Sequence, residues 1–119
     1  MNYVLDVHTH TIASGHAYNT MREMAKAASE KGLELLGITE HAMAMPGTCH
    51  EYYFQNLKMV EREMYGIELL LGSEVNILDS LGNVDLEENI RKKNGYYYCK
   101  PSYSLHETSN KRRKYSGIY

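Results

Sequence analysis

The sequence predicts an α/β protein built on a parallel sheet. Short apolar runs alternate with helix-length segments in the order β-α-β-α-β over residues 3–93, which is the pattern of right-handed βαβ units. Each of the three apolar runs also ends in residues of metal-ligand type, and parallel sheets gather functional side chains where their strands end. A length of 119 residues allows one small domain.

The individual elements follow from local signals along the chain. Thr20 begins a helix, because Glu23 completes a capping-box pattern three residues later and Gly32 stands where a C-cap glycine belongs. A second stripe of apolar residues at helical spacing ends before Gly66, and we interpret Gly66, like Gly32, as the glycine that follows a helix. We therefore expect strands at residues 3–7, 33–38 and 67–71 with 75–77 as a continuation, loops at 11–19 and 42–50, helices at 20–31, 51–65 and 87–93, and a turn at 79–83.

Composition places the chain among globular proteins and separates two regions by charge. The chain is 43% hydrophobic and 24% charged, with a formal net charge of −2. Residues 1–90 hold 5 Lys/Arg and 14 Asp/Glu, whereas residues 91–119 hold 8 Lys/Arg and one acid. Two cysteines without a pairing framework suit a reducing cytoplasm. Neither an apolar run of membrane-spanning length nor a signal-peptide pattern occurs, so we expect a cytoplasmic protein without a membrane partner.

Five side chains carry metal-ligand chemistry and are predicted to converge. His8 and His10 are two residues apart, so on a strand both imidazoles point to the same face. His16 follows in the next loop, whereas His41 and Glu74 end the second and third expected strands. Imidazole and carboxylate groups bind zinc, manganese and iron. A single histidine is more often a surface or core residue, and the coincidence of three strand ends is what indicates a metal site.

Two acids beside these histidines allow two interpretations. Asp6 or Glu40 could accept a hydrogen bond from the far nitrogen of a ligating histidine and fix its tautomer. Alternatively, both are charged residues that happen to lie near a strand end. Cys49 has no partner cysteine at metal-ligand spacing, and we expect it and His50 to be ordinary loop residues.

These motifs resemble the PHP (polymerase and histidinol phosphatase) family. The segment Ser14-Gly15-His16-Ala17-Tyr18 is most similar to the small bacterial phosphatase branch of that family. The resemblance implies the amino-terminal βαβαβ portion of a distorted (βα)₇ barrel, and therefore a truncated PHP domain at residues 1–93. It is carried by Asp6-Val7-His8-Thr9-His10, by His16, by Ile38-Thr39-Glu40-His41 and by Gly72-Ser73-Glu74-Val75-Asn76.

The resemblance also implies a chemistry for the predicted site. His8 and His10 would hold one divalent ion, Glu74 would bridge that ion to a second, and His16 with His41 would hold a third. Zinc is the first expectation, with manganese or iron as alternatives. A metal-activated water would hydrolyse a small phosphate monoester, and nucleic acid is not an expected partner. Catalytic residues beyond the ligands are unknown at this stage.

Residues 94–119 depart from the pattern that precedes them. They hold six of the eleven tyrosines, including Tyr96-Tyr97-Tyr98, and the basic run Lys111–Lys114. We expect a Tyr-rich basic tail that is non-native or disordered. In one permitted coding, a shift of one nucleotide turns the tyrosine run into isoleucines that lead to a histidine, so a frameshifted tail is one hypothesis. A natural basic extension is the other.

Three functional interpretations stay open at the level of sequence. The first is a PHP-family phosphoric ester hydrolase whose activity is impaired in a truncated chain. The second is a non-catalytic module that binds metal or phosphate, and the third is a nucleic-acid-processing PHP domain. An incomplete barrel would leave an exposed core and an open sheet edge, through which the chain could self-associate.

Overall fold

A mixed sheet of five strands organises the computed structural model of the protein, which describes residues 3–94 and 96–101. Four of the strands are parallel to their neighbours, and a short one is antiparallel. The elements in chain order are β1 (Leu5–Thr9), η1 (Ile12–Ser14), α1 (Met21–Glu30), β2 (Leu35–His41), α2 (Glu51–Asn56), η2 (Leu57–Met59), β3 (Glu63–Met64), β4 (Ile67–Ile77), α3 (Glu88–Asn94) and β5 (Tyr96–Pro101).

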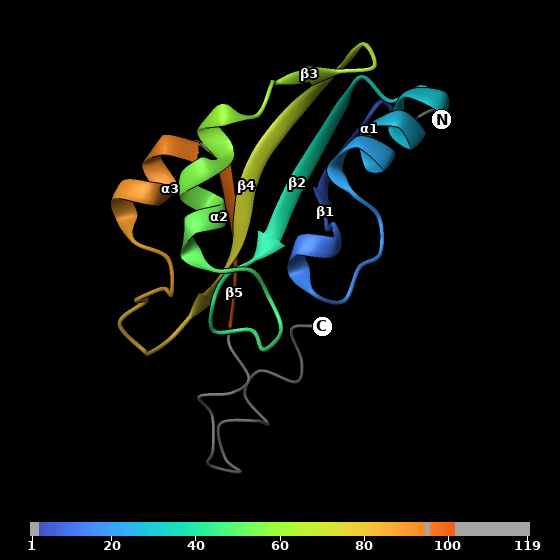
Figure 1. The fold of residues 1–119 in the computed structure, drawn as a ribbon. Coiled ribbons are helices and arrows are strands. Elements are labelled where there is room, and N and C mark those ends of the chain that lie inside the picture. The colour runs from blue at the N-terminus through green and yellow to red at the C-terminus, as the bar shows by residue number, and fades with distance from the viewer. Residues whose placement is uncertain (1–2, 95, 102–119) are drawn as a thin grey trace.

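The 11-residue strand β4 occupies the centre of the sheet. One of its edges pairs with β2 along the whole of that strand, and β1 follows on the other side of β2. Its other edge is shared, because antiparallel β3 pairs with its amino end and parallel β5 pairs with residues 72–77. The carboxyl ends of β1, β2 and β4 therefore lie at the same end of the sheet (Figure 1).

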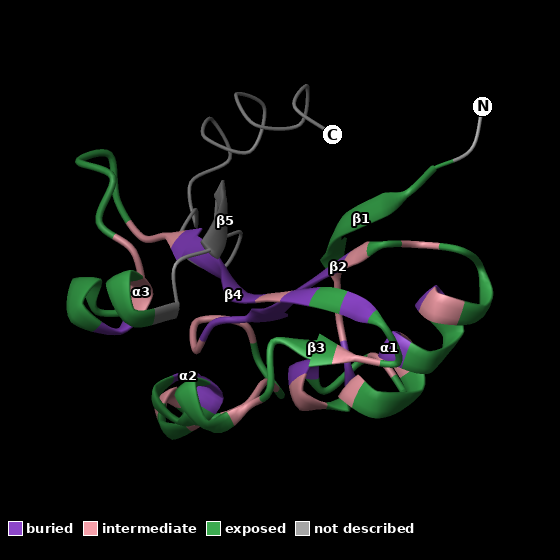
Figure 2. Cartoon of the chain, turned by 90° about the horizontal axis from the view of Figure 1, so that it is seen from above, coloured by how far each residue is buried: buried purple, intermediate pink, exposed green. Residues whose placement is uncertain are grey.

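The helices α1, α2 and α3 all lie on one face of the sheet (Figure 2). The sheet curls away from them, so that β1 rises at one side of it. This arrangement confirms the α/β prediction, because a curled parallel sheet with helices on its outer face is what part of a βα-barrel requires. The core between the sheet and the helices includes Leu36, Ile38, Leu69, Leu71 and Val75 from the sheet and Ala25, Ala28, Phe54, Leu57, Leu86 and Ile90 from the facing segments.

Helix α1 confirms the capping box predicted at its start. The Thr20 hydroxyl accepts the backbone N–H of Glu23 at 3.3 Å, and the Glu23 carboxylate accepts the backbone N–H of Thr20 at 2.7 Å. That backbone bond, together with one from the Thr20 hydroxyl, holds the pKa of Glu23 below its ordinary value. Gly32 follows the C-cap residue with a φ of +80°, as the prediction of a C-cap glycine requires.

The helix expected at residues 51–65 is wrong in its second half. Helix α2 ends at Asn56, the short turn η2 ends at Met59, and the following residues lead into β3. Tyr65 and Gly66 both have positive φ, at 52° and 77°, and they connect β3 to β4 as a two-residue hairpin turn. A helix C-cap and this turn both favour glycine for the same conformational reason, so Gly66 alone could not distinguish them.

The strands extend further toward their carboxyl ends than expected. β1 covers residues 5–9 instead of 3–7, β2 covers 35–41 instead of 33–38, and β4 includes the proposed continuation. His41 is the last residue of β2, as predicted. His8 lies inside β1, and Glu74 lies inside β4 instead of ending it.

The described structure also continues into the segment expected to be a tail. Helix α3 reaches Asn94, and the backbone of residues 96–101 forms β5 along β4, although the sequence shows no strand period there. Strand pairing uses backbone groups, so it does not depend on an alternating side-chain pattern. Residues 102–119, with the basic run Lys111–Lys114, lie outside the described residues. Within the described ranges, no helix is both long enough and apolar enough to cross a bilayer.

We expect Phe54→Ala to lower the free energy of unfolding by about 3–5 kcal/mol, because Phe54 is 0% exposed and its removal leaves a cavity in the core. Tyr52 lies two positions earlier on α2 and is 68% exposed, so Tyr52→Ala is the matched control, with an expected loss of about 0.5 kcal/mol or less. Urea denaturation followed by circular dichroism measures both. Equal losses would show that α2 does not pack on the sheet through Phe54.

Candidate metal centre

A buried carboxylate lies at the centre of the candidate site. Glu74 is 3% exposed and sits in β4 directly opposite His41 of β2. Its Oε2 atom lies 3.0 Å from Nε2 of His10, 3.2 Å from Nδ1 of His41 and 3.5 Å from Nε2 of His8. Three imidazole nitrogens, carried by the carboxyl ends of β1 and β2, therefore converge on one carboxylate oxygen.

This donor set fits a divalent metal ion. The ligand atoms of His8, His10 and Glu74 all lie within 4.8 Å of one another. Two ligands that are each about 2.0–2.1 Å from one tetrahedral zinc ion stand roughly 3.3 Å apart. The three nitrogen–oxygen distances of 3.0–3.5 Å fall around that value. An ion in this position would also compensate the charge of a carboxylate that is withdrawn from water.

The two remaining ligand candidates complete the group. The His41 ring stacks on His10 with ring centroids 4.3 Å apart, and the His16 ring lies tilted beside His41 with centroids 4.6 Å apart, 6.2 Å from the ring of His10. His16 comes from the loop after η1 and is exposed, whereas His41 is buried. The five side chains singled out from the sequence thus lie together, with His16 on the solvent side.

Two hydroxyl groups contact the nitrogens of His8 and His10 that face away from Glu74. Thr39 Oγ1 lies 2.8 Å from Nδ1 of His8, and Ser14 Oγ lies 3.0 Å from Nδ1 of His10. Sequence reasoning missed both residues because it considered only carboxylates for this role. Thr39 shares a face of β2 with a predicted ligand, so strand alternation could have found it. Ser14 gives no such signal, because it belongs to the short turn η1.

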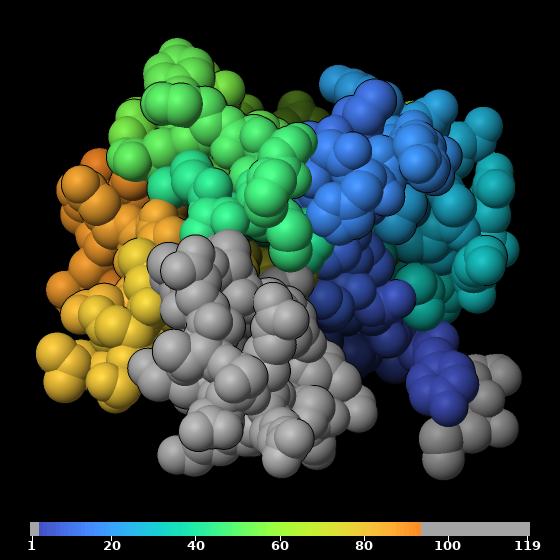
Figure 3. All heavy atoms as spheres, turned by 90° about the horizontal axis from the view of Figure 1, so that it is seen from below, coloured from blue at the N-terminus to red at the C-terminus, as the bar shows by residue number. Residues whose placement is uncertain are grey.

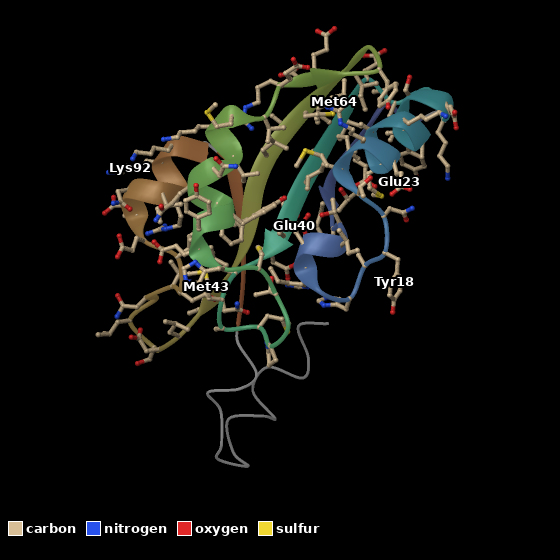
Figure 4. The ribbon with its side chains drawn as sticks, viewed as in Figure 1. Tyr18, Glu23, Glu40, Met43, Met64 and Lys92 are labelled. Atoms are coloured by element: carbon tan, nitrogen blue, oxygen red, sulfur yellow. The ribbon has the colours of Figure 1, made fainter. Side chains whose placement is uncertain are left out.

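The two acids considered for this role differ in their contacts. Glu40 is fully buried near the end of β2 (Figure 4). Its carboxylate accepts hydrogen bonds from the N–H and O–H of Thr11 and from the Ser14 hydroxyl. Glu40 therefore reaches an imidazole through a hydroxyl and not directly. Asp6 is exposed and accepts the backbone N–H of His8 at 3.1 Å.

Two loops meet beside the site through their backbones. A Cβ atom added to Gly15, which follows η1, would stand 1.9 Å from the carbonyl oxygen of Gly47 in the loop after β2. Figure 3 shows the two loops against each other at the end of the sheet where the strands finish. The Asp85 carboxylate accepts the backbone N–H of Ala44 at 2.7 Å and so holds the second loop from its other side.

Side chains that could act as nucleophiles are held in their neutral forms. Burial raises the pKa of the Cys49 thiol, although a hydrogen bond with Thr48 opposes that effect. Burial, and then the charge of Glu40, raise the pKa of the Tyr53 hydroxyl well above its ordinary value. His50 lies outside the cluster, where its side chain accepts a backbone N–H at the start of α2.

Comparisons with known proteins place this chain in a family. The chain matches the family model described as PHP domain over residues 6–117. A probable phosphatase of Clostridium novyi is 58% identical over 92 residues, which cover 77% of this chain and 38% of the relative. One of Thermoanaerobacter pseudethanolicus is 54% identical over 93 residues, 78% of this chain and 38% of the relative. One of Clostridium acetobutylicum is 44% identical over 107 residues, 90% of this chain and 42% of the relative. The chain therefore spans about two fifths of the length of these curated relatives.

We expect Gly15→Ala to destabilise the protein more than Gly47→Ala. Both glycines have a φ of +82°, so each alanine carries a similar backbone strain of about 1–2 kcal/mol. Only the alanine at Gly15 also meets backbone atoms, because nothing lies within 4 Å of a Cβ at Gly47. Chemical denaturation measures the difference, and the NMR signals of His16 report any displacement of its loop. Equal losses would contradict the close approach of the two loops.

Cys49 should react slowly with iodoacetamide in the folded protein, and its rate should rise only at higher pH than for an ordinary thiol. The reason is that burial raises its pKa, and the thiolate is the reactive form. Peptide mass spectrometry distinguishes Cys49 from Cys99, and the same chain in denaturant is the control. Equal rates in the folded and denatured chain would show that Cys49 is not protected.

Proposed function

We propose, since this chain belongs to the PHP domain family, that it carries ligands of a metal-dependent phosphoesterase centre. The observation that carries the proposal is the convergence of three imidazole nitrogens on Oε2 of Glu74 at 3.0–3.5 Å. The names of the relatives support the reaction, because proteins similar to this chain over 77–90% of its length are called probable phosphatases.

The proposed ligands divide into two groups around Glu74. His8, His10 and Glu74 would hold one ion, because their ligand atoms lie within 4.8 Å of one another. His41 and His16 would contribute to a neighbouring position, since His41 contacts Glu74 and the ring of His16 lies 4.6 Å from that of His41. Zinc is our first expectation, and manganese and iron are alternatives because all three bind imidazole and carboxylate donors.

The charges of these ligands favour an anionic substrate. A divalent ion bound here supplies a Lewis acid for a phosphoryl oxygen and an activated water. Glu74 brings one negative charge, and neutral histidines bring none, so the ligands leave net positive charge at the site. The substrate that matches this charge is a small phosphate monoester. Exposed His16 marks the side from which it would approach.

The metal-free chain should bind zinc or manganese through the cluster. We expect His10→Ala and Glu74→Gln each to weaken binding by more than about 100-fold, because each removes a direct ligand and loss of a supporting contact alone costs about 10–100-fold. His50→Ala is the control, since His50 caps α2 outside the cluster. Calorimetric titration measures the affinities. Binding that survives both substitutions would exclude this site.

Hydrolysis of p-nitrophenyl phosphate tests the reaction itself. Any turnover should require added metal, disappear on chelation and fall at least about 100-fold in His10→Ala, because the ion supplies the activated water. Turnover that persists under chelation would overturn the metal-dependent reaction. Metal binding without turnover would instead assign this chain a binding role, as one of the alternative interpretations of the sequence supposes.

A further inference from the structure

We propose that Ser14 is a positioning residue that sets the tautomer of His10. Ser14 is 0% exposed, and its hydroxyl oxygen has three hydrogen-bonding neighbours. These are the Glu40 carboxylate, the backbone N–H of His41 at 3.0 Å and Nδ1 of His10 at 3.0 Å. The consequence for metal binding rests on the proposed function, whereas the tautomer itself does not.

The proton of the Ser14 hydroxyl goes to Glu40. A carboxylate only accepts hydrogen bonds, and Glu40 also receives the N–H and the O–H of Thr11. The Thr11 hydroxyl oxygen in turn accepts the backbone N–H of Ala13 at 3.2 Å, which leaves its own proton for Glu40. Among the described residues, Thr11 and Ser14 thus each give a hydroxyl proton to the Glu40 carboxylate.

The remaining contacts of the Ser14 oxygen fix the proton on His10. A hydroxyl has one proton and two lone pairs. The backbone N–H of His41 fills one lone pair, so the other faces Nδ1 of His10. Two lone pairs cannot bond to each other, and Nδ1 of His10 must therefore carry the ring proton.

This tautomer prepares the opposite nitrogen of His10 for a cation. With the proton on Nδ1, Nε2 carries a lone pair, and it faces Oε2 of Glu74 at 3.0 Å. Both atoms are then acceptors, and a positive ion between them satisfies both. The buried group of Glu40, Thr11 and Ser14 on the helix side thus determines that His10 directs the lone pair of Nε2 toward Glu74 on the other face of the sheet.

His8 gives a useful contrast, because its hydroxyl partner is not fixed in the same way. The Thr39 hydroxyl lies 2.8 Å from Nδ1 of His8 and 3.4 Å from the carbonyl oxygen of Thr9, so it has two acceptors to choose from. The proton count leaves the tautomer of His8 open. Thr39→Val is therefore a control that removes a hydroxyl next to a neighbouring histidine while leaving the Ser14 contacts in place.

Two-bond proton–nitrogen correlation spectra of the metal-free 119-residue chain read the tautomer directly, at a pH high enough that the same spectra show His10 as a neutral imidazole. We expect His10 to carry its proton on Nδ1 in the wild type and in Thr39→Val. A wild-type His10 with its proton on Nε2 would overturn the proposal without any substitution, so the test does not depend on a variant folding.

Glu40→Gln provides the sharper test. The new amide nitrogen would donate to Ser14, whose proton would then turn toward Nδ1 of His10, so the proton on His10 should move to Nε2. Ser14→Ala should remove the preference for Nδ1. Circular dichroism confirms that each variant is folded. A folded Glu40→Gln protein that keeps the wild-type tautomer would overturn the proposal.

Cobalt titration separates this proposal from the proposed function. Glu40→Gln should weaken Co²⁺ binding about 10–100-fold, which is the usual effect of losing a group that orients a ligand. Thr39→Val should leave the tautomer of His10 unchanged. If the tautomers behave as expected but the wild type binds no Co²⁺, the positioning role stands and the proposed function fails. If the wild type binds Co²⁺ and Glu40→Gln changes neither tautomer nor affinity, the positioning role is wrong.

Discussion

The burial of two carboxylates at the same end of the sheet sets a requirement that the surrounding structure has to meet. Glu40 and Glu74 lie on adjacent strands but on opposite faces, since Glu40 pairs with Ser73 and Glu74 pairs with His41. An ionised carboxylate withdrawn from water costs several kcal/mol unless its charge is compensated. Glu40 is compensated by the N–H and hydroxyl donors of Thr11 and Ser14. Glu74 is surrounded by three imidazole nitrogens. Neutral imidazoles do not compensate the charge of the carboxylate themselves, but they can bind a cation together with it.

The two faces of the sheet therefore have different roles at this end. On the helix side, the turn η1 supplies the Ser14 hydroxyl to Glu40, and Gly15 after the turn lies close against the backbone of Gly47. On the other face, His10 before this turn stacks its ring on His41, and His16 after the turn lies with its ring tilted beside that of His41. The segment around η1 is therefore held to the sheet on the helix side by Glu40 and carries the two imidazoles on the other side. Preorganisation of this kind is what metal sites and active sites require of their supporting residues.

The sequence predicted those features that depend on neighbouring residues. The capping box at Thr20 and Glu23 and the parallel order of the strands follow from local pattern, and both are confirmed. The gathering of His8, His10, His16, His41 and Glu74 followed from strand ends and family resemblance. Local pattern failed where one residue type serves two structures, as at Gly66, and where a contact spans distant segments. Ser14 meets Glu40 across 26 positions, so no spacing rule could reveal that bond.

The hairpin that local pattern missed lies at the opposite end of β4 from the metal-ligand cluster. β3 pairs only with the amino end of β4, and the turn residue Tyr65 is 51% exposed. The backbone of this turn is anchored by one side chain of α1, through Ser29 Oγ and the Tyr65 carbonyl oxygen at 2.8 Å. An exposed turn remote from the chemistry tolerates new covalent attachments and new chain termini better than most positions. Tyr65-Gly66 is therefore a suitable place to attach a fluorophore without disturbing the end of the sheet that carries the histidine cluster.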